Sequence, residues 1–243
     1  MPVQEALIEV ALPQRQPLRP LDGFNGSLAQ RVYASLRHAI LSLDLRPGDI
    51  VRKPEICQIL GVSRSPVSEA VARLAAEHLV RVVPQAGTYV ARLSLDEIRE
   101  GAFLREALEV AAVERVAQTV TEDQLVQLRH NIHLQAELIK LGDFAGFYQT
   151  DAAMHELILT FTGFKRAAVM ADTSWVHVNR ARQLILPAAG RIEATLTEHQ
   201  AILTAIEGRD PAKARDAIRH HLGRLIGYLE PLALSRPDLF EPD

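Results

Sequence analysis

The stretch LGVSRSPVSEAVARLAAEHLV, residues 60–80, constrains the fold of this chain more than any other. It has the pattern of two short helices joined by a tight turn at Gly61, and Arg64 stands where the second helix starts. Pro66 fits the first turn of that helix, where its missing N–H costs little. Such a pair, with an exposed basic residue, is typical of proteins that read the major groove of DNA. The alternative is an ordinary amphipathic helix pair.

The flanking residues complete a winged helix-turn-helix over 25–93. Apolar residues in 27–43 recur at steps of three and four, which predicts a helix capped by Ser27. After the second helix, VRVVPQAGTYVARL alternates around a PQAG turn, which predicts a small β-hairpin. Residues 1–24 are expected to form a loose arm, and residues 236–243 a C-terminal tail.

The charge of the chain changes sign at about residue 93. Residues 25–92 carry nine Lys and Arg against five Asp and Glu, whereas 93–243 carry sixteen against twenty-two. A basic part joined to an acidic part indicates that only the first meets phosphate. One cysteine, no apolar run long enough to span a membrane, and an N-terminus unlike a signal peptide together indicate a cytoplasmic protein.

From residue 94 onward the periodicity is purely helical. Helices are expected over 95–119, 122–141, 143–161, 165–186, 191–207 and 211–232. Six helices with short loops favour an antiparallel bundle over 94–235. The expected fold class is therefore mostly α: an N-terminal winged helix-turn-helix followed by a C-terminal six-helix antiparallel bundle.

Four residues of metal-ligand type project into the apolar faces of these helices. On helical wheels, Asp151 and His155 lie one turn apart within one apolar stripe. His199 lies at the centre of a second stripe and His221 beside a third, whereas His220 points to solvent. The turn GRDP lies about midway between His199 and His221, so an antiparallel pair of helices brings them to the same height.

These four side chains need partners, because burying a carboxylate or an imidazole without one is costly. Each histidine can be a hydrogen-bonded core residue, or all four groups can hold one divalent metal. Zn²⁺ is the first expectation because imidazole suits it, with Ni²⁺ and Mn²⁺ as alternatives. Three neutral histidines and one aspartate leave a bound divalent ion with uncompensated positive charge, and hence room for an anion.

Candidate DNA contacts divide into base readers and phosphate contacts. Arg64 at the helix start can bond to guanine through two hydrogen bonds. Its polar neighbours in the same region are Ser63, Ser65 and Ser68. The candidates for phosphate contacts, which position a domain without reading sequence, are Arg31, Arg37, Arg52 and Lys53. The alternative is that these groups are solvated surface charges.

The segment PGDIVRKPEICQILGVSRSPVSEAVARLAAEHLVRVVPQAGTYVA resembles the DNA-binding domain of the GntR family of bacterial transcription regulators. The resemblance covers about 45 residues without a gap and is most specific at GVSRSPV. It implies that Arg64 contacts bases and phosphates and that Gly87 is the glycine of the wing tip. The chain departs from the family pattern at Ser68, usually a second contacting arginine, and at His78, usually glycine.

The C-terminal part resembles the FCD ligand-binding domain of the FadR branch of that family. The resemblance is carried by LREALEVAAVERVA, DAAMHELI and EHQAILTAIEGRDPAKARDAIRHHL. It implies that the Asp and His set described above is a metal site of the VanR-like type, against which small carboxylates bind. Arg105 matches the arginine that lines the cavity in the family. Asn179, Arg180 and Arg182 are further pocket candidates, although Arg182 can also be a plain surface residue.

Together these features predict a metabolite-responsive regulator, expected to be a repressor, that binds a palindromic operator as a homodimer and senses a small carboxylate. A metal-dependent, hydrolase-like enzyme is one alternative, because three histidines and an aspartate can activate water. A regulator with a purely structural metal is another. The fused helix-turn-helix, and the lack of an obvious general base in the same apolar stripe, favour a regulator over an enzyme.

Overall fold

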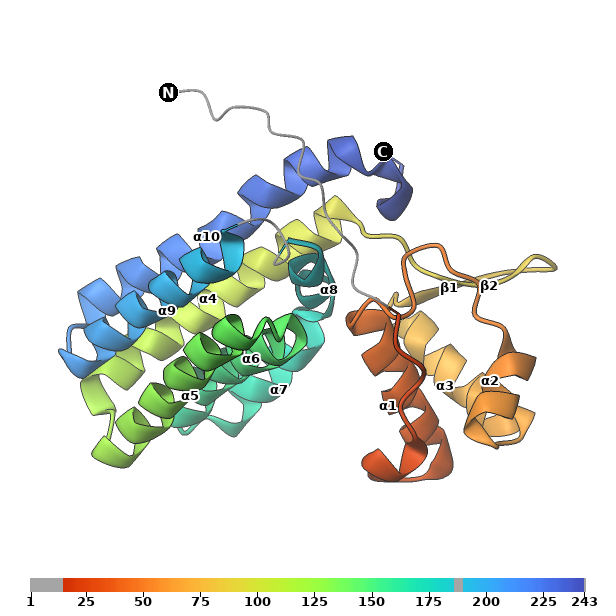
Figure 1. Ribbon diagram of the computed structural model, residues 1–243, viewed down its shortest axis with the longest axis horizontal. Coiled ribbons are helices and arrows are strands. Elements are labelled where there is room, and N and C mark those ends of the chain that lie inside the picture. Colours follow the sequence, from red (N-terminus) through yellow and green to blue (C-terminus); the bar gives the residue numbers. More distant parts are fainter. Residues whose placement is uncertain (1–14, 186–189, 243) are drawn as a thin grey trace. The chain divides into compact units, whose positions relative to one another are not determined.

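The computed structural model describes residues 15–185 and 190–242, which divide into two compact units. Among these residues, one unit comprises 15–95 together with 236–242, and the other comprises Asp96–Ser235. The predicted fold class is confirmed, because helices dominate both units and the named strands of the described residues form one hairpin (Figure 1). Among the described residues, none of the helices combines the length and the hydrophobicity that a membrane span requires.

The first unit is a winged helix-turn-helix. A short 3-10 turn, η1 (Leu21–Gly23), precedes its three helices, α1 (Leu28–Leu41), α2 (Lys53–Leu60) and α3 (Arg64–Ala76). The wing consists of β1 (Val80–Val83) and β2 (Gly87–Val90), which pair antiparallel. In their register Val80 lies opposite Val90, and Val83 lies opposite Gly87.

Local sequence signals set the ends of these helices. Ser27 caps α1 and forms a capping box with Gln30, as its position predicts. Gly61 ends α2 with a φ of 64°, a left-handed conformation that glycine adopts without strain. His78 also has a positive φ, of 56°, which is the backbone shape that favours a glycine at this place.

The core of this unit forms where α1 packs against α3, and it also includes two residues that follow the bundle in sequence. After the turn η2 (Pro237–Leu239), Phe240 pairs with Leu93 in a parallel bridge. Leu239 and Phe240 are both buried. Residues 236–242 therefore pack as part of the winged helix-turn-helix unit and differ from the expected tail, because their two apolar side chains gain free energy when they leave water.

The second unit is a bundle of helices. Its members are α4 (Leu95–Thr119), α5 (Glu122–Leu141), α6 (Phe144–Phe161), α7 (Lys165–Ser174), α8 (Val176–Ile185), α9 (Arg191–Glu207) and α10 (Pro211–Ser235). The described residues thus form seven helices where six were expected, because the helix predicted over 165–186 breaks at Trp175. No glycine or proline marks this break. Instead Trp175 is buried beside Arg105 of α4, whose guanidinium carbon lies 5.0 Å from the ring centroid.

The packing of the bundle brings distant helices together around one interior. Helices α9 and α10 lie side by side and antiparallel, and α5 packs against both α6 and α9 (Figure 1). Apolar residues fill most of this interior. It also buries several charged and polar side chains from α4, α5, α6, α8, α9 and α10, which form the site described next.

Candidate functional site

Helices α6, α9 and α10 bring the four candidate metal ligands together. Asp151, His155, His199 and His221 are at most 6% exposed, and one ligand atom of each lies within 4.8 Å of the others. The Nε2 atoms of His199 and His221 are 3.3 Å apart. Oδ1 of Asp151 lies 3.3 Å from Nε2 of His155 and 3.5 Å from Nε2 of His199. The structure therefore joins residues that the helical wheels placed on separate apolar stripes.

A further set of buried acceptors orients the three imidazole rings. In each ring Nδ1 faces a side-chain oxygen: His155 with Glu109 at 2.5 Å, His199 with Gln135 at 2.8 Å, and His221 with Glu198 at 2.7 Å. A neutral ring in this position carries its proton on Nδ1 and donates it to the oxygen. The lone pair of Nε2 is then free for the centre of the cluster, as in histidines that bind metals.

Arginines hold the two acceptor carboxylates in turn. Arg105 donates from Nε to Glu109 at 2.6 Å, and Arg191 donates to both oxygens of Glu198 at 2.7 and 2.9 Å. Burial alone would raise the pKa of Glu109, but Arg105 and His155 lower it to about 2. Burial would also raise the pKa of Glu198, but the hydrogen bonds from His221 and Arg191 lower it to about 2. Both carboxylates are therefore ionised and fixed.

Asp151 has one oxygen with a partner and one without. Arg182 of α8 donates a hydrogen bond to Oδ2. Burial would raise the pKa of Asp151, but the charge of Arg182, with smaller effects from the neighbouring imidazoles of His155 and His199, keeps it well below its usual value. Within the described ranges, neither Oδ1 of Asp151 nor Nε2 of His155 has a satisfactory hydrogen-bond partner, although both atoms are buried. A cation bound between them would satisfy both atoms.

The donor set fits a divalent transition metal. Burial lowers the pKa of His199 well below its usual value and that of His221 to about 4, so both are neutral near pH 7. Three imidazole nitrogens and one carboxylate oxygen are ligands that Zn²⁺ accepts. On a tetrahedral ion with bonds of about 2.1 Å, neighbouring ligand atoms lie about 3.4 Å apart. The shortest separations in the cluster, 3.3 to 3.5 Å, match that value.

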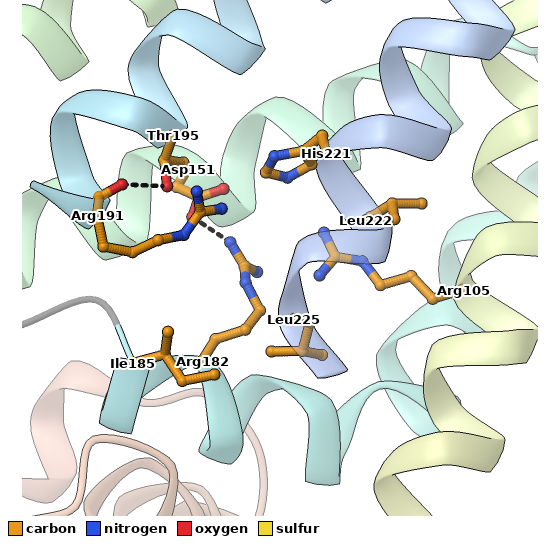
Figure 2. Close-up of a pocket in the computed structure, with 9 residues that line it drawn as sticks. All are labelled: Arg105, Asp151, Arg182, Ile185, Arg191, Thr195, His221, Leu222 and Leu225. Atoms are coloured by element: carbon orange, nitrogen blue, oxygen red, sulfur yellow. Dashed lines mark hydrogen bonds and ion pairs between the residues drawn. The ribbon is translucent and has the colours of Figure 1, made fainter. Parts of the chain in front are cut away.

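A small cavity of about 30 Å³ borders the cluster (Figure 2). Asp151 and His221 form part of its wall. The guanidinium groups of Arg105, Arg182 and Arg191 approach it from α4, α8 and α9. This concentration of cationic groups beside a candidate metal centre suits an anion.

A second and larger cavity, of about 180 Å³, shares two of these arginines. Arg105 and Arg182 line it together with His155 and Asn179. Arg105, Asn179 and Arg182 therefore line a cavity, as expected, whereas the fourth pocket candidate, Arg180, is buried and lines neither of these two cavities. Arg182 is 7% exposed, so it is not a plain surface residue.

The candidate base readers lie at the start of α3 in the other unit. Arg64, Ser65 and Ser68 are exposed on this helix, and Ser63 is its N-cap residue. Gly87 begins β2 at the wing turn with a φ of 130°, which a side chain would not tolerate well.

The candidate phosphate contacts differ in their exposure and in how strongly a nearby carboxylate pairs with them. Arg52 is exposed and lies 3.2 Å from Glu55. Lys53 and Arg31 are half-buried. Nε of Arg37 lies 3.5 Å from Glu77, so a carboxylate already balances its charge. Arg52 is thus the best placed of the four to meet a phosphate, since a surface ion pair of this kind is weak.

Comparison with known proteins identifies both units. The model of the bacterial regulatory proteins of the gntR family matches residues 28–90, and the FCD domain model matches residues 100–224, about half of the chain. The chain belongs to the GntR family. The family assignment that the sequence motifs suggested is confirmed, and this GntR protein is a transcriptional regulator.

Individual relatives agree with this assignment. The HTH-type transcriptional repressor RspR of Escherichia coli (strain K12) is 28% identical over 230 residues, which cover 95% of this GntR chain and 98% of that protein. An uncharacterized HTH-type transcriptional regulator in an unstable DNA locus of Streptomyces ambofaciens is 30% identical over 220 residues. This match covers 90% of this chain and 92% of that protein. The solved structure of E. coli McbR/YncC shows the same fold, with a TM-score of 0.73 at 21% identity. The match covers 86% of this chain and 99% of that chain.

Sequence reasoning missed the groups that position the ligands of this GntR protein. They are Glu109, Gln135, Arg191 and Glu198. Two signals were available. Glu109 follows Arg105 by four residues, a spacing that favours an ion pair on a helix. Asn131 and Gln135 are likewise four residues apart, a spacing that favours a hydrogen bond between two amides on a helix, and the structure shows this bond at 2.8 Å.

Proposed function

We propose that this GntR regulator is a metabolite-responsive repressor that binds a palindromic operator as a homodimer. Each chain carries one recognition helix, α3. Two copies related by a two-fold axis read the two halves of a palindrome, which raises both affinity and specificity. Because its target is DNA, we place the working protein in the cytoplasm.

The buried cluster beside the arginine-lined cavity carries the sensing part of the proposal. Asp151, His155, His199 and His221 would hold a divalent ion, with Zn²⁺ the first expectation and Ni²⁺ or Mn²⁺ the alternatives. When bound, the ion supplies positive charge that attracts an anionic ligand.

The charges around the cluster favour a carboxylate effector. Three buried arginines each pair with one carboxylate, so their charges cancel. The pairs are Arg105 with Glu109, Arg182 with Asp151, and Arg191 with Glu198. The ion therefore adds charge that no protein group compensates. A small carboxylate would offset it, and the guanidinium groups of Arg105 and Arg182 would hold the anion in a fixed orientation.

A regulator fits this site better than a metal-dependent hydrolase. Water activation at a metal needs a base that is free to accept a proton. Glu109 and Glu198 each hold an arginine and a histidine, and the pKa of each is about 2. Carboxylates tied in this way are poor general bases, so we propose that the protein is not an enzyme.

The test combines metal content, ligand binding and operator affinity of the full-length protein. Small carboxylates should raise the melting temperature of the metal-loaded protein and change its affinity for the DNA upstream of its own gene. His221→Ala should lose both effects. If the protein binds metal but no carboxylate changes either quantity, the metal is structural. Ester hydrolysis that requires metal and His221 would instead support an enzyme.

A further inference from the structure

Half of the residues that line the larger cavity of the C-terminal unit are apolar, and the metal cluster does not account for them. The apolar side chains that line it are Ala152, Leu159, Ala168, Ala171 and Trp175. Its volume is about 180 Å³. An apolar cavity of about 150 Å³ in another protein holds a benzene molecule. This cavity therefore has room for a small ring or a short carbon chain.

Two buried N–H donors on the same wall form no hydrogen bond with any residue that the structure describes. They are Nη2 of Arg105 and Nε1 of Trp175, in side chains that are 3% and 7% exposed. The guanidinium carbon of Arg105 lies 5.0 Å from the centroid of the Trp175 ring, so the two residues face the same region. Buried donors normally have partners, and a ligand with two acceptors would supply both.

We propose that the effector is a carboxylate with a small apolar body and a second hydrogen-bond acceptor, and that this cavity determines its specificity. The proposal rests on the carboxylate sensing proposed above. The carboxylate meets Arg105 and Arg182, which line both the larger cavity and the small cavity beside the cluster. The apolar body lies against Leu159 and the Trp175 ring, and the second acceptor takes the indole N–H.

The same wall discriminates against two other kinds of acid. Sugar acids carry hydroxyl groups that would lose their water partners against alanine and leucine side chains. Dicarboxylates would place a second charge in the apolar space or beside Glu156, an exposed carboxylate that lines the same cavity. Acids with one carboxylate and an apolar body avoid both costs.

The first experiment measures binding of acetate, pentanoate, benzoate, succinate and gluconate to the full-length protein by calorimetry. Affinity should rise from acetate to pentanoate by about fourfold for each buried methylene. Succinate and gluconate should bind no better than acetate. Ala168→Leu, which fills the cavity, should remove the advantage of pentanoate and benzoate but keep acetate binding. The matched control is Ala107→Leu, because Ala107 is exposed on α4 outside the cavity.

The second experiment tests the role of the indole N–H. Pentanoate is compared with 2-oxopentanoate and 4-oxopentanoate, and at least one oxo acid should bind about fivefold more tightly. Trp175→Phe keeps an aromatic ring but removes the N–H, so it should abolish that preference and leave pentanoate affinity nearly unchanged. Trp175 is the one tryptophan of the chain, so its fluorescence should change when pentanoate binds.

The outcomes separate this inference from the proposed function. If succinate and gluconate bind as tightly as pentanoate, carboxylate sensing stands but the apolar specificity pocket is wrong. If none of the carboxylates binds, both fail. An oxo-acid preference that persists in Trp175→Phe shows that the second acceptor lies elsewhere, for example on the metal, and overturns the assignment of the indole N–H.

Discussion

At the scale of single residues, the site depends on which way each histidine faces. His220 and His221 are adjacent in α10 but have opposite environments: His220 is exposed, and His221 is buried with its Nδ1 2.7 Å from Glu198. A rotation of 100° per residue places one on the surface and the other in the core. This pair therefore offers a matched comparison on one helix.

We expect His221→Ala to remove bound metal and lower the melting temperature, because a metal that binds only the folded state stabilises it by mass action. His220→Ala should change neither quantity. Elemental analysis and thermal unfolding of the two variants measure both. Metal loss in His220→Ala with retention in His221→Ala would contradict the ligand assignment on α10.

The buried ionisable groups predict that the metal-free protein loses stability in acid. His221 has a pKa of about 4 when folded against an ordinary 6.5, so the unfolded chain binds more protons between these values and stability falls as pH drops through them. Glu109 and Glu198, with pKa values of about 2 against 4.5, stabilise the fold above about pH 4.5 and lose this effect towards pH 2. Urea unfolding at pH 7, 5.5 and 4.5 measures the slope. His221→Ala serves as the control, and its free energy of unfolding should fall less steeply from pH 7 to 4.5. An equally steep fall in this variant would exclude the role of His221.

At the scale of elements, the N-terminal half of α3 presents mainly short side chains to solvent. Ser65, Ser68 and Glu69 are exposed there, and Arg64 is the one basic side chain of this half of the helix. Further along, the guanidinium carbon of Arg73 lies 3.7 Å from the centroid of the Tyr33 ring, and its Nε lies 3.4 Å from a carboxylate oxygen of Glu77. Base reading by this helix should therefore depend strongly on Arg64.

We expect Arg64→Ala to weaken operator binding by about 1–3 kcal/mol and to relax specificity at one base pair. Fluorescence anisotropy with the operator and with single-base variants measures both effects. Arg52→Ala provides the contrast. If Arg52 meets a phosphate, its loss weakens binding to all sequences alike and lowers the salt slope by about one. Unchanged affinity and specificity in Arg64→Ala would rule out base reading by this residue.

At the scale of the whole molecule, the C-terminal unit is inserted between two parts of the DNA-binding unit. The chain passes from one unit to the other after Leu95 and returns at Arg236. Leu93 donates its N–H to Leu239 at 2.9 Å, and its carbonyl accepts from Glu241 at 2.9 Å. The winged helix-turn-helix thus contains residues that follow the bundle in sequence.

We expect Phe240→Ala to destabilise the DNA-binding unit by about 3 kcal/mol, since it leaves a cavity where a buried aromatic ring was. Operator affinity should fall at temperatures where this unit begins to unfold. Leu234→Ala is the control, because Leu234 is 87% exposed at the end of α10. Thermal unfolding and operator binding of both variants provide the measurement. Equal stability of the two variants would show that the C-terminal segment does not support the unit.

The features that could be predicted from the residue pattern alone are those that short-range physics controls. The cap at Ser27, the turn at Gly61, the wing and the long helices follow from backbone preferences and apolar periodicity within a few residues. The inward direction of Asp151, His155, His199 and His221 follows from the same periodicity. Because α9 and α10 are joined by a short turn, even the nearness of His199 to His221 could be predicted.

The groups that position the ligands of the site depend on long-range packing, so they could not be predicted in this way. Glu109 meets His155 across 46 positions and Gln135 meets His199 across 64, and neither pairing has a local pattern that encodes it. The break at Trp175 accompanies its contact with Arg105, and the buried pair Leu239 and Phe240 packs beside Leu93. In each case the deciding free energy comes from burying or pairing groups that are distant in sequence. Such terms depend on how the whole chain packs, and residue patterns within one helix do not contain them.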